Sequence, residues 1–148
     1  MSCFSYIIGA GVIMTFKEKS AAVTLLGLLL VYGGYFSRAW RWSPDTPMAV
    51  VSAALIGTVV SLVVLLIVMH IVVAAFDRKA KEDERDKLIE LKGERNGGFV
   101  VGAGALIAML MLLGELPAVR VIHVLLGAMV LSEIVKIVTQ LWLYRRGV

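Results

Sequence analysis

One apolar stretch near the C-terminal end of the chain carries ionisable and polar side chains at helical spacing. These are Ser132, Glu133, Lys136 and Gln140. The step of three residues from Glu133 to Lys136 lets an acid and a base meet on one helix face. An isolated charge in the middle of a bilayer costs roughly 2.5–3.5 kcal/mol on insertion scales. We therefore expect Glu133 and Lys136 to pair and to face the interior of a helix bundle.

A histidine on another apolar stretch, His70, is a further candidate member of this intramembrane polar cluster. It precedes Phe76, where that stretch ends, by six residues. At 1.5 Å per residue this places it about 9 Å from the end, near the level of Lys136 and Gln140. A contact of His70 with Glu133 is within geometric reach. Such a cluster can fix helix packing, handle protons or ions, or bind a partner, and packing is its commonest role.

No catalytic or metal-binding motif accompanies these side chains. The sequence has no G-x-S-x-G, H-E-x-x-H, Walker or dinucleotide-binding pattern. Its two histidines lie on different apolar stretches, and its single cysteine forms no thiolate cluster. We therefore expect no enzymatic activity, no cofactor and no metal site.

The elements that must position the polar cluster are apolar stretches long enough to cross a bilayer. Of the 148 residues, 59% are apolar, which is more than a short water-soluble domain can bury. A spanning helix needs about 20 mostly apolar residues. The predicted fold class is an all-α integral membrane four-helix bundle in one domain. Its spans are predicted over residues 20–37, 48–76, 98–114 and 121–143.

Basic residues are distributed unequally between the two sides of these spans. Eleven Lys and Arg residues flank one side, most of them in segment 77–97, and three flank the other side. Since Lys and Arg gather in cytoplasmic segments, both chain termini and segment 77–97 are predicted to be cytoplasmic. The formal net charge of +4 is explained by this asymmetry, so we expect no direct binding of nucleic acid.

The charged cytoplasmic segment 77–97 lies between the second and third spans. It holds seven acidic and seven basic residues, and Leu88 and Leu91 share one helical face. We predict a short helix at the membrane surface that ends at Gly93 or at 97–98. It is either a solvated connector or a docking surface for a cytoplasmic protein. The candidate docking residues are Asp83, Glu84, Arg85, Lys87, Glu90, Lys92 and Arg95.

Small residues in the third span are spaced for close helix contact. Gly98 and Gly102 form a G-x-x-x-G pattern, and Gly104 and Ala108 repeat its spacing. Such rows let two helix backbones approach closely. We expect them to join the third span to a neighbouring helix or to a second subunit of a homo-oligomer.

Residues 1–13 are not needed by any span. The run 1–16 is apolar but too short to cross a bilayer, and it lacks the basic region of a signal peptide. The codons of residues 11–14 can contain a ribosome-binding sequence just before Met14. We therefore expect Met14 to be the natural start and residues 1–13 to be a non-native extension.

Three stretches together resemble a family of small bacterial four-helix membrane proteins. They are FKEKSAAVTLLGLLLVYGGYF (16–36), DERDKLIELKGERNG (83–97) and SEIVKIVTQLWLYRRG (132–147). In its charged stretch the chain is similar to the DUF2178-type membrane proteins, and the resemblance covers most of 14–148. It implies a multi-pass protein of the bacterial inner membrane with a cytoplasmic regulatory partner. It supplies no catalytic residues.

Two functions are compatible with these features. The first is a non-enzymatic membrane partner or scaffold for a cytoplasmic regulatory protein that docks on 77–97. The alternative is a small oligomeric proton-coupled transporter or channel that uses His70, Glu133 and Lys136.

Overall fold

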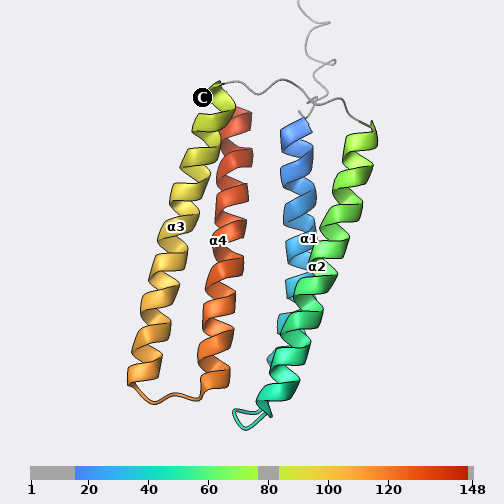
Figure 1. Ribbon diagram of the computed structural model, residues 1–148. Coiled ribbons are helices and arrows are strands. Elements are labelled where there is room, and N and C mark those ends of the chain that lie inside the picture. Colours follow the sequence, from blue (N-terminus) through green and yellow to red (C-terminus); the bar gives the residue numbers. More distant parts are fainter. Residues whose placement is uncertain (1–15, 77–83, 147–148) are drawn as a thin grey trace, which may run out of the picture.

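The computed structural model describes residues 16–76 and 84–146, which form four long helices (Figure 1). By length and composition each helix can cross a membrane. The all-α part of the prediction and its number of long apolar helices are therefore confirmed for the described residues, and the chain has the character of a multi-pass membrane protein. The helices are α1 (Phe16–Ala39), α2 (Met48–Phe76), α3 (Glu84–Leu113) and α4 (Ala118–Arg146).

Proline and backbone geometry set the helix boundaries at the end of the bundle that holds the two short connections. Pro47 and Pro117 each precede a helix, and their carbonyl oxygens accept the first backbone bonds of α2 and α4. Proline is tolerated there because its missing N–H would have no helical partner. After α3, Glu115 adopts a positive φ of 54°. The bonds from Glu115 N to Leu112 O and from Leu116 N to Met111 O then complete a Schellman motif.

The helices form an antiparallel array in which α1 and α4 occupy the central positions. α1 packs against α2 and α4, and α4 packs against α3, so Figure 1 shows one pair of helices beside another. Between the pairs, Leu28 and Tyr32 of α1 meet Val130 and Ile137 of α4 in an apolar core. Most large apolar side chains of α2 are exposed, as expected for a helix surrounded by lipid.

The two ends of this array differ in composition. At the charged end, α1 and α3 begin and α2 and α4 finish, close to the acidic and basic residues of 84–97. At the tryptophan end, residues 40–47 connect α1 to α2 and residues 114–117 connect α3 to α4.

The charged segment differs from its predicted form. It does not make a separate surface helix that ends at Gly93 or at 97–98, because α3 runs without interruption from Glu84 to Leu113. Ile89, Gly93 and Gly97 are buried against α4, and this packing offsets the roughly 0.5–1 kcal/mol that each helical glycine costs relative to alanine. The first half of α3 is therefore a continuous helical extension of the predicted third span.

The predicted spans coincide with the observed helices, and the other predicted boundaries lie outside the described residues. Helix α2 has the predicted bounds 48–76, and the other three predicted spans lie almost wholly inside longer helices. The proposed extension 1–13 and start at Met14, together with residues 77–83, are outside the described part of the chain.

Candidate functional site

A groove between α1 and α4, near the charged end, contains most of the predicted polar cluster. It has a volume of about 420 Å³ and is reached by one side chain of α3, Glu90. We call it the polar groove. It is lined by Lys17, Ser20, Ala21, Thr24, Glu90, Glu133, Lys136, Ile137, Gln140 and Tyr144.

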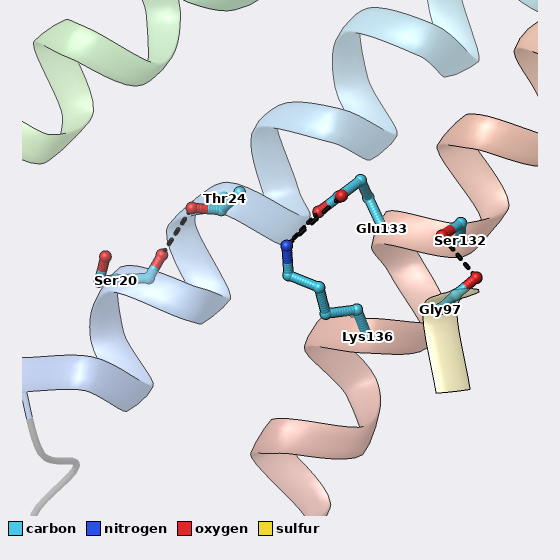
Figure 2. A network of polar contacts seen from close by, with 6 residues as sticks. All are labelled: Ser20, Thr24, Gly97, Ser132, Glu133 and Lys136. Carbon is cyan, nitrogen blue, oxygen red and sulfur yellow. Dashed lines mark hydrogen bonds and ion pairs between the residues drawn. The ribbon is translucent and has the colours of Figure 1, made fainter. Parts of the chain in front are cut away.

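The ion pair of α4 forms within this groove. Lys136 Nζ lies 3.0 Å from Glu133 Oε2 and 3.4 Å from Glu133 Oε1, so the ammonium contacts both carboxylate oxygens. Figure 2 shows both side chains turned from α4 toward α1, where Ser20 and Thr24 lie. The Lys136 side chain is 30% exposed and the Glu133 side chain 47% exposed. The expected contact therefore exists, in an open groove rather than in a closed interior.

Ser132 lies on a different face of α4 from the ion pair. Its hydroxyl is buried and donates to the backbone oxygen of Gly97 at 2.8 Å, across the interface with α3 (Figure 2). Nearby, Asn96 Nδ2 donates to Thr139 Oγ1 at 3.3 Å in the same interface. Ser132 therefore joins two helices and does not line the groove, whereas Gln140 does line it.

His70 belongs to the interface between α2 and α1. Ser20 Oγ lies 2.9 Å from His70 Nε2, and His70 Nδ1 lies 2.8 Å from the carbonyl oxygen of Leu66. In the neutral tautomer that carries its proton on Nδ1, the ring donates to Leu66 and accepts from Ser20. The predicted contact of His70 with Glu133 does not form, because α1 lies between α2 and α4. His70 bonds to Ser20 of α1 instead. Ser20 is shared with the polar groove, so one hydroxyl separates His70 from it.

The candidate docking residues are distributed around the first turns of α3. Asp86 pairs with Lys17 of α1 at 3.5 Å, and Arg85 Nη2 donates to the Tyr144 carbonyl of α4 at 3.4 Å. These contacts hold the start of α3 against both central helices. The candidate Asp83 is outside the described residues, and Glu90 faces the polar groove. The side chains of the other four are exposed: Glu84, Lys87, Lys92 and Arg95.

Of the two predicted pairs of small residues in α3, Gly104 and Ala108 lie on the face that packs against α4, whereas Gly98 and Gly102 do not. A Cβ added to Gly98 or Gly102 would meet nothing within 4 Å. A Cβ on Gly104, by contrast, would overlap the Cβ of Ala128, and Ala108 is buried on the same face. Within this chain Gly98 and Gly102 therefore make no close contact, and their contact with a second subunit stays a prediction.

Gly93 and Gly97 complete the row, although the sequence predicts that a surface helix ends at one of them. A Cβ on Gly93 would lie 3.0 Å from the Lys136 backbone oxygen, and one on Gly97 would lie 3.0 Å from that of Ser132. They follow Ile89 at steps of four residues, which was a signal for a buried face that continues through the charged segment.

A second cluster, at the tryptophan end, joins three segments that are distant in sequence. The Tyr35 hydroxyl of α1 lies 3.0 Å from His123 Nε2 of α4, and their rings stack at 5.7 Å. Trp42, in the α1–α2 connection, packs edge-on against both rings, with centroids 5.9 and 5.7 Å away. Because positions 35, 42 and 123 are far apart along the chain, only the tertiary structure brings these side chains together.

No group of three or more His, Cys, Asp or Glu side chains suited to a metal occurs among the described residues. Comparison with protein-family models, curated proteins and solved structures finds no match for this chain.

Proposed function

We propose that this chain is a non-enzymatic membrane protein that binds a cytoplasmic regulatory protein on the exposed face of the first half of α3. The observation that carries the proposal is the exposure of two large apolar side chains there. Leu88 is 59% exposed and Leu91 is 61% exposed, on a part of α3 that is rich in charged residues.

Lipid tails are a poor cover for these two leucines. Lys87, Lys92 and Arg95 surround them and are exposed on the same helix. Each such charge would cost several kcal/mol in hydrocarbon, so this part of α3 belongs outside the apolar core of the membrane. Two exposed apolar side chains surrounded by charged ones resemble a protein interface, which has an apolar centre and a polar rim.

The helix is already ordered before any partner arrives. Ile89, on the opposite face, is only 1% exposed, and Gly93 packs against α4. A preformed surface loses little conformational entropy on binding, which favours recognition of a specific partner. The excess of basic residues at this end supports a cytoplasmic location, and the resemblance to bacterial four-helix proteins suggests a regulatory partner in an inner membrane setting.

Site-specific photocrosslinking in intact cells tests this proposal. A photoreactive residue at Leu91 should give a discrete protein adduct, whereas one at Leu106 should give lipid adducts. Leu106 is a matched control because it is 63% exposed on the apolar half of the same helix. Lipid adducts alone at both positions would contradict the proposal.

A quantitative test follows once the crosslinked partner is purified. The double variant Leu88→Ser and Leu91→Ser should weaken its binding to nanodisc-embedded protein by tenfold or more, at about 1 kcal/mol for each lost apolar anchor. The variant Leu106→Ser should bind as the parent does.

A proton-coupled transporter is a second candidate function, because Ser20 connects His70 to the polar groove. An exposed α2 and an open groove mean that a closed pathway would need further subunits. Proton flux into proteoliposomes should then fall in Glu133→Gln but not in Ser132→Ala, which removes a hydroxyl from the other face of α4. Flux that is unchanged by Glu133→Gln would remove this candidate site.

A further inference from the structure

A second groove lies at the tryptophan end, between the end of α1, the α1–α2 connection and the start of α4. Its volume is about 530 Å³, within the range of roughly 300–1,000 Å³ that is common for small-molecule sites. Its lining is mostly apolar and aromatic, with Phe36, Trp40, Met111 and Val124 among its side chains. We call it the aromatic groove.

One permanent charge faces this apolar lining. Of the described residues that line the groove, Arg120 alone is charged at neutral pH, and the acidic residues of this end, Asp45 and Glu115, do not line it. Within the described part of the chain, no ion pair involves Arg120. His123 also lines the groove, but its two ring nitrogens already contact Tyr35 and the Val119 carbonyl oxygen. The guanidinium is therefore the group left to bind an anion.

The position of the groove matches the boundary between headgroups and acyl chains. Tryptophan and arginine at the ends of spanning helices lie at headgroup level. Trp40 is 91% exposed, whereas Met111 and Val124 lie within helices on the apolar side of Arg120. A molecule in this groove would have its head beside the guanidinium and its tail against apolar side chains.

We propose that the aromatic groove binds an anionic phospholipid of the surrounding bilayer. Its phosphate accepts hydrogen bonds from the Arg120 guanidinium, and one acyl chain lies along Phe36, Met111 and Val124. The positive charge of Arg120 favours this ligand over a zwitterionic lipid, because the two lipids differ in headgroup charge and not in their acyl chains. The site is at the opposite end of the bundle from the proposed docking face, so the two proposals are independent.

Tryptophan fluorescence quenched by brominated lipids tests the proposal on the full chain in nanodiscs. The double variant Trp40→Phe and Trp142→Phe leaves Trp42, which lines the groove, as the reporter. Brominated phosphatidylglycerol should reach half-maximal quenching at an about fivefold lower mole fraction than brominated phosphatidylcholine. Equal quenching by the two lipids would overturn the proposal.

Arginine variants separate a built site from general surface charge. Arg120→Gln should abolish the preference for phosphatidylglycerol, and Arg120→Lys should retain part of it. Arg41→Gln is the matched control, because Arg41 is at the same end of the bundle but does not line the groove. The preference of the Arg41→Gln variant for phosphatidylglycerol should stay at the parental level. An equal loss of preference in Arg41→Gln and Arg120→Gln would contradict the site.

Competition identifies the chemical class of the occupant. Unbrominated phosphatidylglycerol should relieve quenching in the reporter variant, whereas oleate at the same mole fraction should not. Relief by oleate alone would overturn the proposal in favour of a free fatty acid. Circular dichroism of each variant should match the parent, which makes loss of preference a loss of binding and not of fold.

Discussion

The interface between α3 and α4 and the interface between α1 and α2 use glycine in opposite ways. In the first, Gly93, Gly97 and Gly104 each face atoms of α4 that a Cβ would crowd. In the second, Gly57 has open space, and the nearest atom to a Cβ on Gly27 is the flexible end of Leu66 at 3.1 Å. Glycine content alone therefore does not identify a tight interface; the identity of the facing atom does.

The two interfaces also differ in their polar contacts between helices. The α3–α4 interface contains the Ser132 bond to a backbone oxygen and the Asn96–Thr139 bond. The α1–α2 interface contains the Ser20–His70 bond. Close backbones bring short polar side chains within reach of one another, because Ser and Thr extend only a little beyond the helix surface. α3 and α4 are thus packed more closely against each other than α2 is against α1.

The largest expected effect is at Gly104. Gly104→Ala should destabilise the protein by about 1–3 kcal/mol, because its Cβ would overlap that of Ala128. Removing the opposing methyl with Ala128→Gly should restore much of the loss. Unfolding in mixed micelles with increasing dodecyl sulfate measures both.

Gly102→Ala is the control for that experiment, since this position has open space. It should be neutral or gain up to about 1 kcal/mol from the better helix propensity of alanine. A loss as large as that of Gly104→Ala would show that a second subunit packs closely on the face of α3 that carries Gly102.

A somewhat smaller effect is expected at Gly93. Gly93→Ala should cost about 1 kcal/mol, because one of the crowded atoms is the Lys136 backbone oxygen, which cannot rotate away. Its neighbour in the same helix, Gly98→Ala, should not destabilise. Thermal unfolding followed by circular dichroism distinguishes them, and identical midpoints would contradict the tight packing of the charged half of α3.

Hydroxyl removal compares the two interfaces directly. Ser132→Ala should cost about 0.6 kcal/mol, the average for polar contacts between membrane helices. Ser20→Ala should cost less, since its bond to His70 is only part-buried. A double-mutant cycle of Ser20→Ala with His70→Ala, read from chemical unfolding, measures the coupling of that pair. The Ser132 bond ends on a backbone oxygen, so it is measured by Ser132→Ala alone. A larger loss in Ser20→Ala than in Ser132→Ala would reverse the ranking of the interfaces.

The smallest effect is expected at Gly27. Gly27→Ala should change stability by no more than a few tenths of a kcal/mol, because the Leu66 side chain can adopt another rotamer and alanine favours the helix. Differential scanning fluorimetry in detergent should show an almost unchanged Tm. A clear fall would mean that α2 is held as closely as α3.

Part of the candidate site was predictable because it depends on one helix only. The Glu133–Lys136 pair follows from a spacing of three residues, and this contact needs no partner helix. The partner of His70 was not predictable in the same way. The position of His70 along its helix predicts its depth in the membrane. It does not predict that α1 lies between His70 and α4.

The sequence by itself determined the four helices, because a lipid environment requires every spanning segment to satisfy its own backbone hydrogen bonds. Length and hydropathy are local properties, so they could be summed along the chain. Only the tertiary structure decided that α3 continues through Gly93 and Gly97, that Gly104 packs while Gly102 does not, and that Ser132 leaves the polar groove. These outcomes depend on which atoms of a neighbouring helix lie opposite each residue.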